Sequence, residues 1–139
     1  MKNNIVLARA PMDSGKALFV MEEFSKDGHS FRATVRLNEK HPVFEGHFPG
    51  QPVVPGVFTL QLVKECLSYA LEKELRFTDV QNCRFSRTIV PGAQPRLEVR
   101  GSCEQQAAEA YALNASVQAA GVTFLSLKAK LVAAAPRMF

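Results

Sequence analysis

The sequence predicts an α+β domain in which one long helix is buried against an antiparallel sheet. Several segments alternate apolar with polar residues, which is typical of half-buried strands. Residues 57–75 instead carry apolar residues at helical spacing. Residues 42–56, just before them, are rich in glycine and proline. Because a single apolar helix among strands is buried only where the sheet covers it, we expect the sheet to wrap the helix.

Upstream of the glycine- and proline-rich segment, residues 30–37 form the clearest strand. Polar residues alternate with apolar ones, so the apolar residues all fall on one face. These apolar residues are Phe31, Ala33, Val35 and Leu37. Residues 17–24 are a weaker strand candidate. The run Ile5-Val6-Leu7-Ala8 near the start is too short for the apolar region of a secretory signal.

The segment from Pro42 to Gly56 holds seven of the sixteen glycine and proline residues of the chain. Proline removes a backbone donor and fixes φ, so this density excludes a helix or a central strand. The segment is predicted to be a rigid, turn-rich loop, and long rigid loops usually carry function.

Residues 57–75 are predicted to form a helix of about five turns. Pro55 precedes the start, and Glu72-Lys73-Glu74 forms a charged tail. The first half is apolar nearly all round, which favours burial. After Arg76 the period changes to two, and four strands are expected at residues 82–90, 96–104, 108–118 and 122–131. The turn signals between them are Pro91-Gly92, Glu104-Gln105-Gln106 and Gly121.

Composition excludes several classes of protein. The length of 139 residues fits one domain, and 47% apolar with 22% charged residues is an ordinary globular balance. No apolar run is long enough to span a bilayer. The three cysteines are far apart, so neither a disulfide framework nor a metal site is expected, and the chain is predicted to be cytoplasmic with free thiols. The basic residues behind the net charge of +4 are scattered, which argues against nucleic acid and fits an acidic protein partner.

Two residues of the loop have the chemistry of a site that acts next to a carbonyl group. His47 follows a glycine and precedes Phe48-Pro49, and histidine transfers protons near neutral pH. Gly56 opens the buried helix, where a backbone N–H without a neighbouring side chain can donate to a carbonyl oxygen. Taken singly, each has a structural alternative: a loop histidine or a simple helix start. His29 and His41 lack such a setting and are expected at the surface.

The loop resembles the signature of the hot-dog-fold 3-hydroxyacyl-[acyl carrier protein] dehydratases of bacterial fatty acid synthesis. The family pattern G-H-F-P-G-x-P-x-x-P-G-V is matched at every fixed position by residues 46–57. A second similarity begins at Cys83-Arg84-Phe85 and ends at Pro91-Gly92. The resemblance covers about residues 37–131, and it implies one long helix wrapped by an antiparallel sheet. Residues 1–139 are therefore expected to form a single hot-dog dehydratase-like domain.

The resemblance also implies roles for individual residues. His47 corresponds to the catalytic histidine, Val53 to the residue whose carbonyl orients it, and Gly56 to the donor to the thioester carbonyl. The family's catalytic Asp or Glu, fourteen positions after the histidine, is replaced here by Gln61. The reaction would convert (3R)-hydroxyacyl thioesters into trans-2-enoyl thioesters, in fatty acid synthesis or in a specialised acyl or polyketide pathway.

An amide has nearly the shape of glutamate but cannot exchange a proton at neutral pH, so Gln61 leaves three alternatives open. His47 acts as both base and acid while Gln61 positions the hydroxyl group. Another carboxylate substitutes, with Glu65 one helical turn further on or Glu45 beside the loop. In the third alternative the protein is a non-catalytic acyl- or carrier-binding subunit, or an acyl thioesterase.

The family further implies a substrate carried by acyl carrier protein or coenzyme A, no cofactor, and a homodimer or a multiple of dimers with shared sites. His47 of one subunit would then face Gln61 of the other. The substrate pocket is expected to involve Phe48, Val53, Val57, Phe58, Leu60 and Phe85. The rim that meets the acidic carrier is expected to carry Arg84, Arg87 and Arg96.

Overall fold

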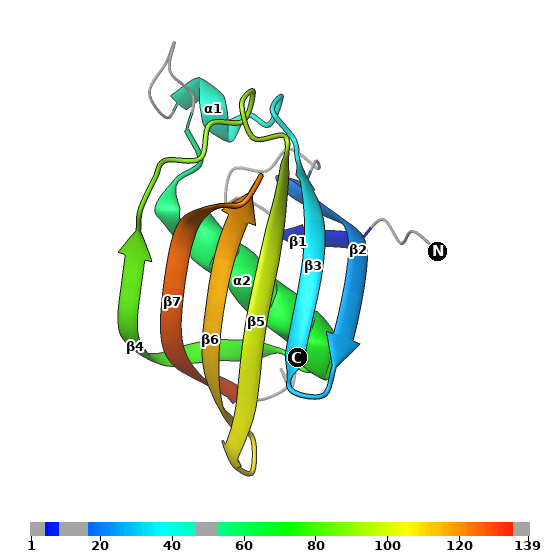
Figure 1. The fold of residues 1–139 in the computed structure, drawn as a ribbon, viewed down its shortest axis with the longest axis vertical. Coiled ribbons are helices and arrows are strands. Elements are labelled where there is room, and N and C mark those ends of the chain that lie inside the picture. Colours follow the sequence, from blue (N-terminus) through cyan, green and yellow to red (C-terminus); the bar gives the residue numbers. More distant parts are fainter. Residues whose placement is uncertain (1–4, 9–16, 47–52, 135–139) are drawn as a thin grey trace, which may run out of the picture.

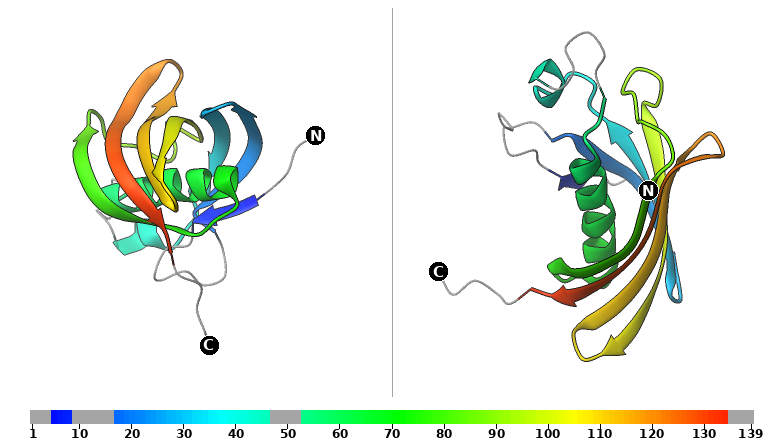
Figure 2. Two further views of the ribbon diagram at one scale, coloured as in Figure 1. Left: turned by 90° about the horizontal axis from the view of Figure 1, so that it is seen from below. Right: turned by 90° about the vertical axis from the view of Figure 1, so that its left-hand side faces the viewer.

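The computed structural model describes residues 5–8, 17–46 and 53–134, and it shows a curved antiparallel sheet around one long helix (Figure 1). Seven strands lie in the order β1-β2-β3-β5-β6-β7-β4, so β1 and β4 are the two edges. Seen from the side, helix α2 (Gly56–Leu71) lies against the inner face of the sheet, which curls around it (Figure 2). This arrangement confirms the predicted fold class.

The strands β1 to β3 form one half of the sheet: β1 is Ile5–Ala8, β2 is Phe19–Asp27 and β3 is Ser30–Leu37. The alternation predicted for β3 is confirmed, because its four apolar side chains are all buried and Arg32 and Arg36 are exposed. Strand β2 extends three residues beyond its predicted end. β1 was not predicted: its four apolar residues are too few to show a period, and only pairing with β2 makes them a strand.

The helix α2 begins one residue before its predicted start and ends four residues before its predicted end. Glu72 adopts a left-handed conformation (φ 56°, ψ 41°), and its N–H donates to the carbonyl of Ser68. Such a cap stops a helix without requiring glycine. The chain then enters β4 at Leu75, which is buried. The prediction that residues 72–75 continue the helix is therefore wrong.

The strand predicted at residues 82–90 is also displaced, because β4 runs over Leu75–Phe85. Most of its side chains are exposed, and its pairing with β7 shifts register twice. A strand at a sheet edge with bulges has no clean burial period, which explains why residues 75–81 gave no strand signal. After Phe85 the chain leaves the ladder, so residues 86–90 belong to the loop that leads to β5.

The remaining strands form two hairpins close to the predictions: β5 is Arg96–Ala107, β6 is Ala110–Ala119 and β7 is Val122–Ala133. The turn expected at residues 104–106 is instead inside β5, and the chain reverses next to Glu109, whose φ is 63°. The turn at Gly121 is confirmed.

The glycine- and proline-rich segment contains a one-turn helix, α1 (Val43–Gly46), which corrects the prediction that no helix forms there. It lies at the end of the molecule where α2 begins (Figure 1). Val43 and Phe44 are buried in the main core, and burial of these neighbours stabilises a turn that propensity alone would not predict.

Candidate functional site

The start of α2 is held in place by the loop that follows β4. The N–H of Val54 donates to the carbonyl of Ile89 at 2.9 Å, and both side chains are buried. Pro55 has the extended conformation of an N-cap (φ −60°, ψ 139°), and its carbonyl accepts from the N–H groups of Phe58 and Thr59. The N–H of Gly56 precedes these bonds, as the first N–H groups of any helix do. The predicted donor is therefore presented at a rigid helix start.

Gly56 borders a groove of about 440 Å³ between the helix start and the loop after β4. Three of the predicted substrate-pocket residues line it with Gly56: Val53, Val57 and Phe85. Val57 and Phe85 are 64% and 48% exposed, so two large apolar side chains face solvent at this groove. The groove thus brings an apolar surface and a helix N-terminus together.

The absence of a side chain at Gly56 matters because the ring of Phe85 lies directly against it. A Cβ atom at this position would be 2.9 Å from Cζ of Phe85 and 3.3 Å from both Cε atoms. Ordinary carbon contacts are longer, at roughly 3.5–4.0 Å. Gly56 therefore makes room for the ring, in addition to presenting its N–H.

Other predicted residues fall elsewhere. Phe58 and Leu60 are partly buried and pack against the core, and neither lines the groove. His47 and Phe48 lie outside the described residues, and so does the side chain of Glu45. Ser86 and Thr88 line the groove but were not predicted, because they fall in the segment that was interpreted as strand.

Gln61 and Glu65 lie one helical turn apart on α2. Both residues are half-buried. Burial raises the pKa of the Glu65 carboxyl, and the negative charge of Glu74 adds to the rise, whereas Lys64 and the Gln61 amide oppose it. The two polar side chains therefore occupy neighbouring positions on one face of the helix.

The three arginines predicted at the rim do not form one cluster. Arg87 borders the Gly56 groove and also a second groove of about 640 Å³, which Arg96 lines from β5. Arg96 donates to Glu22 at 2.7 Å, and this contact holds the pKa of the Glu22 carboxyl below its usual range. Arg84 lies on the edge strand β4, opposite Ser126 of β7. Arg87 is thus the arginine that adjoins the candidate site.

The two other histidines differ from one another. His29 is exposed, as predicted. His41 is only 1% exposed, so the prediction of a surface residue is wrong. Its Nδ1 accepts a hydrogen bond from the N–H of Val43 at 3.0 Å, and its carbonyl accepts from Phe44. His41 therefore holds the turn that leads into α1, a structural role that its neighbours in the sequence do not reveal.

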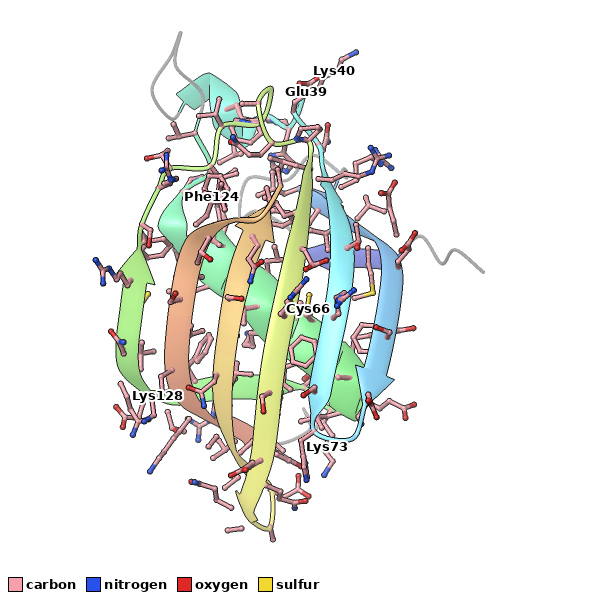
Figure 3. All side chains as sticks on the ribbon, viewed as in Figure 1. Glu39, Lys40, Cys66, Lys73, Phe124 and Lys128 are labelled. Carbon is pink, nitrogen blue, oxygen red and sulfur yellow. The ribbon has the colours of Figure 1, made fainter. Side chains whose placement is uncertain are left out.

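Within the described part of the chain, no three histidine, cysteine, aspartate or glutamate side chains gather as metal ligands. None of the described helices is long and apolar enough to cross a membrane. The cysteines are free thiols: Cys66, Cys83 and Cys103. Cys66 lies on α2 beneath the sheet (Figure 3), and burial raises the pKa of its thiol.

A groove of larger volume, about 660 Å³, is lined by Arg32, Arg100 and several serines. It shares no residue with the Gly56 groove.

The family model for ApeI-like proteins, described as ApeI dehydratase, matches residues 23–123. The chain belongs to the ApeI-like dehydratase family. The match begins in β2 and ends in β7, so it contains the loop, α2 and the groove between them. The family resemblance inferred from the loop motif is confirmed.

Individual relatives support this placement. The chain is 30% identical over 94 residues to the 3-hydroxyacyl-[acyl-carrier-protein] dehydratase FabZ of Haemophilus influenzae strain PittEE, a match that covers 62% of this chain and 64% of the relative. The alignment thus spans less than two thirds of the relative.

Two solved structures share the fold of this chain. A chain of the dehydratase heterocomplex ApeI:P from Xenorhabdus doucetiae superposes with a TM-score of 0.63 at 20% identity, over 81% of this chain and 96% of that one. A mutant of thioesterase PA1618 from Pseudomonas aeruginosa superposes with a TM-score of 0.58 at 12% identity, over 82% and 79% of the two chains. At these identities the likeness is one of fold.

Proposed function

We propose that this ApeI-like protein dehydrates (3R)-hydroxyacyl thioesters of acyl carrier protein to trans-2-enoyl thioesters. One observation carries the proposal: in a member of a dehydratase family, the complete loop motif leads into a helix start that opens onto an apolar groove. FabZ, a 3-hydroxyacyl-[acyl-carrier-protein] dehydratase, is among the relatives. We assign the activity to residues 1–139 acting as one hot-dog domain.

The proposed chemistry begins at the thioester carbonyl. The N–H of Gly56 donates to the carbonyl oxygen and stabilises the negative charge that develops there when C2 loses its proton. His47 receives that proton. The electron pair of the C2–H bond forms the C2–C3 double bond, the C3–O bond breaks, and the oxygen leaves as water once it has gained a proton. No cofactor is required, because the thioester itself acidifies C2.

The carrier is proposed to approach the groove from the side of Arg87. This arginine borders both grooves, and its exposed charge suits an acidic protein partner. Arg96, in the second groove, forms an ion pair with Glu22. Arg84 lies on the edge strand β4. We therefore expect Arg87→Ala to weaken carrier binding more than Arg84→Ala or Arg96→Ala. A coenzyme A thioester would lack that protein contact.

The proposed assembly is a homodimer, or a larger multiple of dimers. Strand β4 ends the sheet with exposed apolar residues, Val80 at 44% and Phe85 at 48%, and Phe85 also lines the groove. A long exposed edge is a natural surface for pairing with a second copy around a two-fold axis. A partner there would cover the Gly56 groove, and His47 of one subunit would meet Gln61 of the other. Light scattering on the purified protein, with Val80→Lys as the disruptive variant, tests this assembly.

The proposed setting is the cytoplasm, where three free thiols remain reduced. The pathway is fatty acid synthesis or a specialised acyl or polyketide pathway.

Gln61 specifically favours a second candidate, a carrier-binding subunit without dehydratase activity, because an amide cannot supply the proton. The thioesterase with the same fold keeps hydrolysis among the outcomes to be measured.

The deciding experiment incubates the protein with a 3-hydroxyacyl chain on acyl carrier protein and follows the carrier by mass spectrometry. Loss of one water that is absent with His47→Ala supports the dehydratase. Release of the free acid identifies a thioesterase. An unchanged carrier that still binds the protein refutes the catalytic proposal and leaves a binding subunit.

A further inference from the structure

We propose that the outer face of the sheet carries a binding site for the phosphate group of a small, water-soluble molecule, with Arg32 and Arg100 at its centre. The site lies in the groove of about 660 Å³, which shares no residue with the Gly56 groove. It is therefore independent of the proposed dehydration. The outer face is the one that α2 does not cover, and it is turned toward the viewer in Figure 1.

The pairing of the strands places the two arginines side by side. Arg32 of β3 is directly opposite Arg100 of β5, and two residues further along Ser30 is opposite Ser102. Directly paired residues share one face of a sheet, and all four of these residues are exposed. Strand β6 continues both rows with one polar residue in each: Ser116 and Asn114. The groove thus has two guanidinium groups in one row and hydroxyl and amide groups in the next.

Two arginines that face each other on neighbouring strands destabilise a sheet unless an anion lies between them. A second such pair on this face, Arg36 and Arg96, has its anion. The carboxylate of Glu22 accepts from Nε of Arg36 at 3.3 Å and from Nε of Arg96 at 2.7 Å. One carboxylate therefore bridges this pair with a hydrogen bond to each arginine.

The pair of Arg32 and Arg100 is bridged less completely. Glu98 accepts a hydrogen bond from Nε of Arg100, but its other oxygen is 3.9 Å from Nε of Arg32, which is too long for a hydrogen bond. The side chains of Arg32 and Arg100 are 57% and 49% exposed, whereas that of Glu98 is 28% exposed. Two guanidinium groups and one carboxylate leave a net positive charge where the groove is open.

The donors around this charge suit a tetrahedral oxyanion. Each guanidinium has five N–H donors, so the two hold more donors than one carboxylate has lone pairs. Rows two residues apart along a strand are about 6.6–6.8 Å apart, so an anion between them meets guanidinium groups on one side and hydroxyl groups on the other. The oxygens of a phosphate group point in several directions and accept from both rows, whereas a carboxylate presents its two oxygens to one side.

The groove has the size of a small-molecule site. Its volume of about 660 Å³ lies within the roughly 300–1,000 Å³ that such sites have. Asp27, which also lines the groove, is opposite Ser30, so a carboxylate stands at the hairpin end and accepts from hydroxyl groups. A ligand with phosphate at the arginines and hydroxyl groups toward Asp27, such as a sugar phosphate, fits both ends. A second copy of this face is disfavoured, because its positive charge would be repelled.

Calorimetric titration and thermal unfolding of the full-length protein, with ribose 5-phosphate and with inorganic phosphate at constant ionic strength, test the site. Wild-type Tm is expected to rise by roughly 3–6 °C when the ligand is about ten times the Kd. Phosphate also stabilises folded proteins without occupying a site, so the deciding quantity is the difference between wild type and Arg32→Gln. Arg32→Gln is expected to bind ribose 5-phosphate at least about tenfold more weakly. The ester is expected to bind more tightly than inorganic phosphate.

Arg36→Gln is the matched control, because it also removes one arginine of an opposed pair on β3 but lies outside the groove. It is expected to bind ribose 5-phosphate as the wild type does. Without ligand the two variants should differ in the opposite sense. Arg32→Gln relieves the repulsion from Arg100 and is expected to keep or raise Tm, whereas Arg36→Gln loses a hydrogen bond to Glu22 and is expected to lower it.

Binding of ribose 5-phosphate that is lost in Arg32→Gln and retained in Arg36→Gln supports the site. Equal losses in both variants refute it, because a general response to positive charge would then be the cause. Inorganic phosphate that binds as tightly as the ester refutes an organic ligand. A wild type that responds to neither phosphate but binds a polyglutamate peptide through Arg32 also refutes the proposal, since the occupant would then be an acidic protein.

Discussion

Replacing Gly56 with alanine should block the groove while leaving the fold intact. The new Cβ would be 2.9 Å from Cζ of Phe85, so the ring must move by about 0.5 Å or more to regain an ordinary contact. Phe85 is 48% exposed, so the ring can turn away cheaply, but the space open to it is the groove itself. The backbone N–H at position 56 remains, while access to it narrows.

Loss of a single donor to a developing oxyanion costs about 10²–10³-fold in kcat, and we expect Gly56→Ala to fall near the lower end of that range. The double variant Gly56→Ala with Phe85→Leu should recover most of the rate, because leucine removes the ring atoms that clash. Phe85→Leu alone provides the control, and thermal unfolding of all three variants should stay close to the wild type. If Gly56→Ala turns over normally, or if Phe85→Leu fails to restore it, the ring contact is not what makes glycine necessary.

Three further predictions concern stability and reactivity. Gly101→Ala should destabilise the fold by about 1–3 kcal/mol in urea unfolding, because its Cβ would lie 2.3 Å from Cε2 of the buried Phe31; an unchanged midpoint would contradict this packing. Glu22→Gln should lower Tm at pH 7, because the contact with Arg96 depresses the folded pKa of Glu22 and its stabilisation is present above the ordinary glutamate pKa of about 4.3. The difference should shrink as the pH falls below that value and disappear below the folded pKa; a difference that stays constant as the pH falls would exclude this contact as the cause. Cys66 should resist alkylation by iodoacetamide in the native protein and react after unfolding, since burial raises its thiol pKa; peptide mapping that finds it labelled in the folded state would contradict its position in the core.

The sequence predicted those elements whose burial follows a period. Strand β3 has one face on the core and one in solvent, and its alternation reproduces that geometry residue by residue. Strand β4 lacks such a pattern because both its faces are largely exposed and two bulges interrupt it, so its first seven residues resembled a helix tail and a loop. The length of α2 was overestimated for a related reason. The helix ends at Glu72, which is in the left-handed conformation, and no glycine or proline in the sequence marks that end.

The candidate site was likewise predictable from the sequence only in part. The position of Gly56 at the helix start was predictable, since Pro55 and the loop motif fix the backbone there. Its contact with Phe85 was not, because it joins residues that are far apart in the chain and depends on where β4 ends. The burial of His41 escaped prediction for the same reason: a histidine that caps a turn and one that faces solvent have similar local sequences.

Gln61 and Glu65 lie one helical turn apart on α2, so a missing acid at one position is weak evidence for a missing function. Side chains four residues apart on a helix touch, so a carboxyl group can occupy either position of such a pair and still serve one place on the helix surface. Burial raises the pKa of the Glu65 carboxyl, which extends the pH range in which its protonated form is present. A sequence motif records the identity of each position separately, whereas the chemistry depends on which groups share one place on the helix surface. The exchange of Gln61 and Glu65 tests this equivalence directly: if the order of the two residues matters little to the rate while removal of both carboxyl groups abolishes it, the pair is the functional unit.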